Sequence, residues 1–167
     1  MTQNEDTIVT LTFKQVEHIL ILGGCPSWRL TRNRAERCQY LVCTRNLVNE
    51  SARGLVIGSE PHGTAFLIGK ISSIEPTNER SIPRVAHYEE IFEGRSIIRI
   101  SEYALVNTNS IYPGVGGGFA YMNISETRID PSSLVWRRIS PPSPFLMEAY
   151  NQFHTWQRMV RDGHIDE

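Results

Sequence analysis

Residues 28–45 combine the two side-chain types that a nucleic-acid surface uses, arginines and aromatic rings. The aromatic residues are Trp28 and Tyr40, and a single acid, Glu36, stands against five arginines. The arginines are Arg29, Arg32, Arg34, Arg37 and Arg45. Because arginine binds phosphate bidentately and any base can stack on a ring, this composition favours nucleic-acid binding. The alternative is a solvated loop whose arginines pair with acids elsewhere in the chain.

A second group of candidate residues lies near the end of a predicted strand. Glu102 and Tyr103 are adjacent, and Tyr112 lies just before a glycine-rich run at residues 114–118. A carboxylate beside aromatic rings could accept hydrogen bonds from the exocyclic amine of a flipped base. The alternative is that both tyrosines pack in the core or at its rim.

Acid–base chemistry requires titratable groups that converge on one pocket. His62, Lys70, Glu75 and Glu102 lie on or beside the two longest predicted strands, and the fold could bring them together. The catalytic candidates among them are Lys70, Glu102 and His62. The sequence EPHG around His62 is also typical of a turn.

Other motifs with known chemistry are absent from the sequence. The glycine run is not followed by the Gly-Lys-Ser/Thr of a phosphate-binding loop, and Phe119 occupies the third glycine position of a dinucleotide fingerprint. Cys25, Cys38 and Cys43 lack both a disulfide-framework spacing and a paired histidine motif. We therefore expect no metal and no cofactor, and interpret the cysteines as free thiols that pack as small buried hydrophobes.

Composition favours one soluble domain. The 167 residues are 40% hydrophobic, which is enough for a single core, so we expect one domain over residues 1–167. A net charge of −1 means that any attraction to nucleic acid must come from a local patch. No apolar run approaches the roughly 18 residues of a membrane span, and the N-terminus is acidic. We expect a cytoplasmic protein without a membrane partner.

The elements that must position these residues follow from capping patterns and periodicity. We expect residues 1–8 to be disordered and a helix to start within residues 11–16, which carry a capping-box pattern. The glycines at positions 23 and 24, with Pro26, predict where this helix ends. Residues 28–37 lack a clean period and favour a loop or a short irregular helix.

The rest of the chain is predicted to be rich in strands. Strand-like composition occurs at residues 39–44, 54–57, 63–74, 95–106, 119–124 and 134–139. Gly69 lies inside the longest of these and predicts a bulge or bend. A helical turn is expected at 88–92, and an amphipathic helix at about 144–161. That helix could dock on the barrel, form a homodimer contact or bind a partner protein.

Four stretches resemble a known superfamily. They are Trp28 with its arginine-rich continuation, YLVCTRN at 40–46, AFLIGKI at 65–71 and IRISEYA at 98–104. Together they resemble uncharacterised bacterial proteins and, in strand order, the PUA-like superfamily of PUA, ASCH, EVE and YTH domains. The likeness covers roughly residues 28–139. The Gly-x-Lys-x-x-Glu-x-Arg signature of ASCH domains is absent, which argues against their amidohydrolase activity.

The resemblance implies an α+β fold built on a small curved β-barrel of five to seven strands, with an N-terminal helix and a C-terminal amphipathic helix. It also implies a pocket that in several branches holds a modified or flipped base.

Three functions compete on this basis. The first is a module that binds nucleic acid or a nucleotide-like ligand. In it Glu102 reads the base edge, while stacking rings and phosphate-binding arginines hold the ligand. The rings are Trp28, Tyr103 and Tyr112, and the arginines are Arg32, Arg34 and Arg37. The second is a hydrolase for a small nucleoside-like substrate, and the third is a protein-interaction module in bacterial or phage conflict that uses the C-terminal helix.

Overall fold

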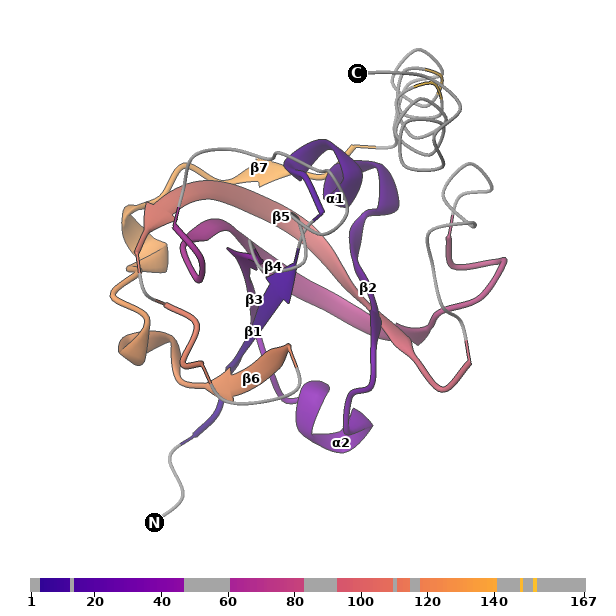
Figure 1. Cartoon of the computed structure of the whole chain (residues 1–167), viewed down its shortest axis with the longest axis horizontal. Coiled ribbons are helices and arrows are strands. Elements are labelled where there is room, and N and C mark those ends of the chain that lie inside the picture. Colours follow the sequence, from indigo (N-terminus) through magenta and orange to yellow (C-terminus); the bar gives the residue numbers. More distant parts are fainter. Residues whose placement is uncertain are drawn as a thin grey trace.

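The computed structural model describes residues 4–12, 14–46, 61–82, 93–109, 111–114 and 118–140, together with Glu148 and Gln152. Its described strands form one mixed sheet in the order β2-β5-β4-β3-β1-β6, with β7 paired to β5. The sheet curls into a half-barrel that has α1 at one end and α2 at the other (Figure 1). The predicted curved, strand-rich core is thus confirmed in its coarse form.

Two long antiparallel strands form the centre of the sheet. The strands are β1 (Thr7–Thr12), β2 (Gly24–Trp28), β3 (Tyr40–Arg45), β4 (Ala65–Pro76), β5 (Ser96–Thr108), β6 (Phe119–Met122) and β7 (Arg137–Arg138). The helices are α1 (Val16–Leu22) and α2 (Arg32–Ala35), with short 3-10 helices at Ile124–Glu126 and Pro131–Ser133. β1 runs parallel to β3, and the other paired strands are antiparallel.

Four predicted strands are confirmed as β3, β4, β5 and β6, and the one predicted at 134–139 is reduced to the two residues of β7. The segment 28–37 was predicted to be a loop or a short irregular helix, and it contains the short helix α2. The strand predicted at 54–57 and the helical turn predicted at 88–92 lie outside the described residues.

The N-terminal prediction was wrong. Thr7–Thr12, part of which was expected to be disordered, forms β1 between β3 and β6. The first four of its six residues are all buried. The sequence TIVTLT is rich in β-branched residues, which suit a strand that is covered on both faces. Thr12 does not cap a helix; its hydroxyl accepts a hydrogen bond from the Lys14 amide at 3.1 Å. The helix starts only at Val16, and Gln15 makes no side-chain cap.

The predicted end of this helix is confirmed at Gly23. Its φ of 70° lies in the left-handed region, and its amide bonds back to the Ile19 and Leu20 carbonyls. Glycine adopts this conformation without the steric cost that a Cβ would add. The helix therefore stops one residue before β2 begins.

The curl of the sheet is concentrated where β4 pairs with β5. Their register shifts between Ala65 and Leu67, and again on both sides of Ile71. At Gly69 a Cβ would lie 2.6 Å from the Cγ2 of Ile100, so the absence of a side chain lets that isoleucine fill the concave side. Bulges beside such a glycine bend both strands, as the sequence predicted.

The sheet separates two hydrophobic clusters. The inner cluster fills the half-barrel and joins strands that are not neighbours, with buried members that include Ile8, Ile19, Cys25, Leu41, Cys43, Leu67, Ile98 and Ile100. The outer cluster lies on the opposite face, and the side chains packed against it include Tyr112, Met122, Ile124, Leu134 and Trp136. Its buried members are Val9, Val42, Ala65, Ile68, Ala104, Ile111 and Ile129.

The predicted C-terminal helix lies almost wholly outside the described residues. Glu148 and Gln152 are both helical, and the Gln152 amide donates to the Glu148 carboxylate at 3.2 Å, one turn away. None of the helices in the described residues has the length and apolar character needed to cross a membrane.

Candidate nucleic-acid interface

The two edge strands of the half-barrel, β2 and β6, meet through aromatic side chains. Trp28 ends β2 and Phe119 begins β6, and their rings meet edge-on with centroids 6.1 Å apart. The Trp28 Nε1–H donates to the Cys25 sulfur at 3.3 Å, which orients the indole. Within the described residues no backbone ladder joins β2 to β6. We call the group formed by Trp28, Phe119, Tyr121 and Arg34 the seam.

Tyr121 extends the seam along β6. Phe119 and Tyr121 are two residues apart and therefore lie on the same face of the strand. Their rings are 5.8 Å apart and nearly perpendicular, and the Arg34 guanidinium carbon lies 4.2 Å from the Tyr121 centroid. Burial raises the pKa of the Tyr121 phenol, so the ring remains neutral beside the cation. This contact fixes α2 against β6.

Arg34 is held on its other side by an acid that precedes β1. Its Nε and Nη2 donate to the two oxygens of Glu5 at 2.6 and 2.5 Å. The hydrogen bond with Arg34 lowers the pKa of Glu5, and the charges of Arg34 and Arg37 lower it further. Arg34 is therefore bound to a carboxylate and is less suited to gripping phosphate than the sequence predicted.

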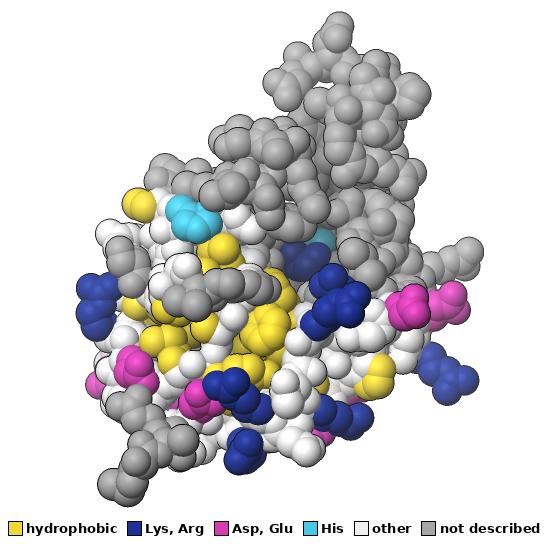
Figure 2. All heavy atoms as spheres, turned by 60° about the horizontal axis from the view of Figure 1, so that its bottom comes forward, with side chains coloured by type: hydrophobic (Ala, Val, Ile, Leu, Met, Phe, Trp, Pro, Cys, Tyr) yellow, Lys and Arg dark blue, Asp and Glu magenta, His cyan; other side chains and the backbone are white. Residues whose placement is uncertain are grey.

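The other predicted phosphate-binding arginines remain exposed around the seam. Arg32 pairs with Glu36 at 2.7 Å within one helical turn, and Arg37 Nε donates to the Asn33 carbonyl. Arg29 is exposed directly after Trp28. Figure 2 shows hydrophobic side chains gathered on the side that carries α2 and β6, with basic side chains beside them.

Arg45 does not belong to this surface. It is 6% exposed, and its guanidinium carbon lies 3.8 Å from the Phe66 ring centroid. Its Nη1 donates to the Lys14 carbonyl at 3.4 Å. The predicted cluster of five arginines is thus divided between the surface and the interior.

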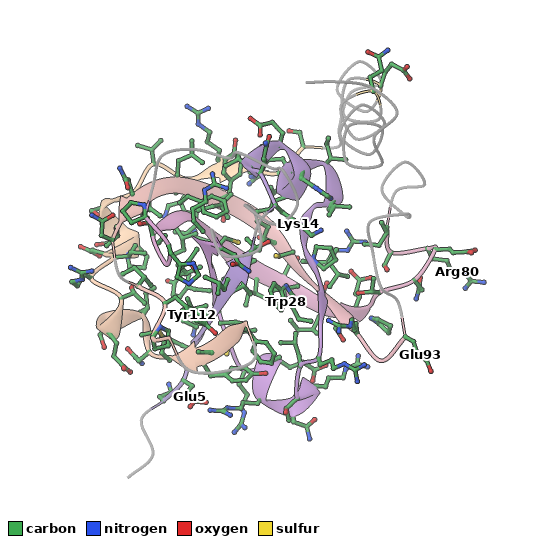
Figure 3. The ribbon with its side chains drawn as sticks, viewed as in Figure 1. Glu5, Lys14, Trp28, Arg80, Glu93 and Tyr112 are labelled. Carbon is green, nitrogen blue, oxygen red and sulfur yellow. The ribbon has the colours of Figure 1, made fainter. Side chains whose placement is uncertain are left out.

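Tyr112 borders the seam at Gly118. Its ring is half-buried against the outer cluster, and burial raises the pKa of its phenol while a hydrogen bond with the Gly118 backbone lowers it. Gly118 also touches Trp28: a Cβ there would lie 3.3 Å from the indole Cζ3. Trp28 and Tyr112, labelled in Figure 3, are therefore connected through one glycine.

We expect Gly118→Ala to displace Trp28 and to destabilise the fold by about 1–2 kcal/mol. Its φ of +79° is a conformation in which a Cβ is strained, and the same Cβ would press on the indole. Fluorine NMR of fluorotryptophan-labelled protein would report the Trp28 signal, and urea unfolding would report stability. Gly114→Ala is the matched control, because φ is +74° there but nothing lies within 4 Å. Equal Trp28 shifts in both variants would contradict the contact.

The catalytic candidates Lys70 and Glu102 meet on the outer face of the sheet. Their strands place them opposite one another, and Lys70 Nζ lies 3.2 Å from Glu102 Oε2. The ammonium also lies 4.6 Å from the Trp136 ring centroid, and Trp136 stacks on Tyr40. The structure thus brings two of the three candidates together as a partly exposed ion pair.

Glu102 and Tyr103 do not share a site, which corrects the prediction that they act together. Neighbouring residues of a strand point to opposite faces. Glu102 faces Lys70 on the outer side, whereas Tyr103 packs against the inner cluster. A base held by Tyr103 could not be read by Glu102. Neither residue belongs to the seam.

His62 lies away from the acid–base pair. It is exposed in the turn that precedes β4, and Lys70 is five residues beyond the start of that strand. At 3.3 Å per residue, Lys70 is about 17 Å along the strand from the residue that begins β4. Glu75, the other acid considered, is bound to Arg99 at 2.5 Å. The three proposed catalytic groups do not converge.

The three cysteines are buried free thiols. Burial raises the pKa of Cys38 to about 11, and a hydrogen bond with Cys25 together with burial raises that of Cys43 well above its usual value. The thiols of Cys38 and Cys43 therefore remain protonated and unreactive at neutral pH. Within the described residues, no group of three or more histidines, cysteines or acids could hold a metal ion.

Sequence reasoning missed two members of the seam, Phe119 and Tyr121. Their spacing of two residues in a short strand after the glycine run was the available signal. The sequence did not show that β6 lies next to Trp28, which precedes β6 by about 90 residues in the chain. Trp136, which completes the Lys70 environment, was missed for the same reason.

Comparison with known proteins gave no match. No family model, no curated protein and no solved structure is similar to this chain at a significant level. The PUA-like resemblance therefore stays a prediction, and the function must be argued from the residues themselves.

Proposed function

We propose that the chain binds single-stranded nucleic acid or a nucleotide-like ligand at the seam. The observation that carries this proposal is the aromatic group of Trp28, Phe119 and Tyr121 bordered by exposed arginines. Bases stack on aromatic rings with little dependence on sequence, and arginines follow the phosphate backbone. Trp28 and Tyr121 pack against the inner cluster, which supports both rings from below.

The structure changes which residues the proposal uses. Trp28 and Phe119 supply stacking surface, and Arg29, Arg32 and Arg37 supply charge. Arg34 positions α2 through Glu5 and Tyr121 rather than contacting phosphate. Tyr112 borders the site through Gly118. Glu102 faces Lys70 on the outer side of the sheet, and Tyr103 packs against the inner cluster without belonging to the seam, so the proposal uses neither residue.

The experiment is salt-dependent binding of short, unmodified and base-modified single- and double-stranded DNA and RNA, measured by fluorescence anisotropy. We expect Arg32→Gln combined with Arg37→Gln to weaken binding and to reduce the salt slope by about 0.7 for each lost contact to a single strand. Both side chains are exposed, so the fold should be unaffected.

Arg80→Gln is the matched control. Arg80 is exposed in the turn that follows β4, away from Trp28 (Figure 3). It removes an arginine charge without touching the seam. An unchanged slope in the double variant, or an equal loss in the control, would contradict a localised interface. No binding even at low salt would remove nucleic acid as the ligand.

A further inference from the structure

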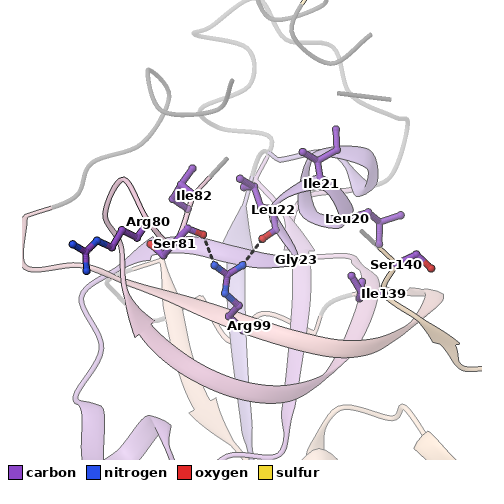
Figure 4. A pocket seen from close by; sticks show the side chains of 10 residues that line it. All are labelled: Leu20, Ile21, Leu22, Gly23, Arg80, Ser81, Ile82, Arg99, Ile139 and Ser140. Carbon is purple, nitrogen blue, oxygen red and sulfur yellow. Dashed lines mark hydrogen bonds between the residues drawn. The ribbon is translucent and has the colours of Figure 1, made fainter. Parts of the chain in front are cut away.

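A pocket at the α1 end of the half-barrel has the features of a small-molecule site. Its volume is about 470 Å³, within the range of roughly 300–1,000 Å³ typical of ligand pockets. The walls come from the end of α1, the turn after β4, the first part of β5 and the residues after β7 (Figure 4). It lies at the opposite end of the fold from α2.

The walls of this pocket are mainly aliphatic. Leu20, Leu22, Ile82 and Ile139 line it together with Ile21, while Ser81 and Ser140 add small polar groups. Such a lining favours an apolar ligand body that leaves water. Gly23, at the end of α1, opens the wall beside Arg99: a Cβ there would lie 3.4 Å from the Arg99 Nη1.

Arg99 supplies the charged group of the pocket. Its side chain is 26% exposed, and three hydrogen bonds fix it: to Glu75 from Nε, to the Leu22 carbonyl from Nη1 and to the Ser81 carbonyl from Nη2. A guanidinium carries five N–H donors. One N–H on each terminal nitrogen therefore has no acceptor among the described residues. Figure 4 shows these two nitrogens directed toward Ser81 and Leu22 at the pocket.

We propose that this pocket binds a small amphipathic carboxylate. Its apolar body packs on the aliphatic walls, and its carboxylate accepts hydrogen bonds from the two remaining Arg99 N–H groups. Glu75 already offsets part of the Arg99 charge, and Arg80 adds one more positive charge at the rim. A monoanion matches this balance better than a doubly charged phosphate. The inference does not depend on the proposed function of the seam.

The probes are 4-phenylbutyrate and its uncharged counterpart 4-phenylbutan-1-ol, which share one apolar body. Titrations are followed by methyl NMR of the isoleucines in the full chain. We expect saturable shifts confined to Ile21, Ile82 and Ile139, with the carboxylate bound about tenfold more tightly than the alcohol, because its hydrogen bonds are charge-assisted. 4-Phenylbutylphosphonate should bind more weakly than the carboxylate at a pH where it is doubly ionised.

Two variants separate the contributions of shape and charge. Ile139→Trp fills the pocket and should abolish binding of both probes, whereas Arg99→Gln should remove only the preference for the carboxylate. If Arg99→Gln does not fold, the probe pair on the unmodified chain and Ile139→Trp still decide. Arg32→Gln, which lies beside the seam at the opposite end of the fold, should leave both affinities unchanged. Equal affinities of the two probes, shifts outside the pocket, no saturation at millimolar probe, or normal binding to Ile139→Trp would overturn the proposal.

Discussion

Replacing Gly24 by alanine is expected to destabilise the fold by about 3 kcal/mol, at the upper end of the range for overpacking. Gly24 begins β2 and pairs with Arg99 of β5. A Cβ at this position would lie 2.1 Å from the Ile98 carbonyl oxygen and 2.9 Å from the Arg99 Cα. Both atoms belong to the backbone, so no rotamer change can relieve the clash. The β2–β5 ladder must separate or shift.

Differential scanning calorimetry would measure this effect as a melting temperature lower by about 10 °C for a chain of this length. Gly114→Ala is the control for an added methyl group without a clash. Its φ of +74° carries the strain of the left-handed region, but it has open space around it. Similar melting temperatures for the two variants would show that β2 is not packed against β5 as described.

Trp28→Ala is expected to weaken ligand binding by about 10- to 100-fold, which corresponds to the stacking energy of one base. The substitution removes the ring that joins β2 to Phe119 and leaves the Cys25 sulfur without its indole donor. Trp28→Phe keeps an aromatic face and should retain most of the affinity. Anisotropy titrations with one labelled oligonucleotide would compare the two variants.

Trp136→Ala is the control that tests location. Trp136 is also half-buried, but it stacks on Tyr40 at the outer face of the sheet. Its removal should leave binding within about twofold, inside the scatter expected for a site that is not in contact. Melting temperatures of all three variants show whether each is folded. Equal losses from Trp28→Ala and Trp136→Ala would argue against the seam, and full binding by a folded Trp28→Ala would exclude Trp28.

The strands of the central sheet could be predicted because their signals are local. β4 and β5 are long segments in which isoleucines and an aromatic residue recur, and turns flank them. The left-handed residue at Gly23 follows from a glycine after an apolar helical face. Gly69 marked the bend for a reason that also lies within its own strand. These features depend on near neighbours in the sequence.

The edge of the sheet that holds β1 could not be predicted in this way. A capping-box pattern and a strand compete over residues 7–16, and burial between β3 and β6 decides in favour of the strand. A parallel partner and an antiparallel partner that follows more than 100 residues later leave no mark in a local window. Tertiary contacts overrode the local preference.

The residues of the candidate site also fall into two groups, those with a local sequence signal and those placed by distant strand pairing. Trp28 and the arginines of α2 lie within one segment, so composition was sufficient to find them. Phe119 and Tyr121 reach the same place only through the pairing of β6 with β1. By contrast, the separation of Glu102 from Tyr103 was available from the sequence, since alternation along a strand already requires it.

The position of β1 has a consequence for how the chain folds. β1 joins β3 to β6, and β6 in turn carries half of the seam, so the seam depends on contacts between the two ends of the described sheet. Contacts so distant in sequence require a large loss of chain entropy when the loop between them closes, and they therefore form slowly. We therefore expect the ring contacts of Trp28 to appear in the last kinetic phase of refolding. During synthesis, the seam cannot assemble until residues 119–122 have left the ribosome.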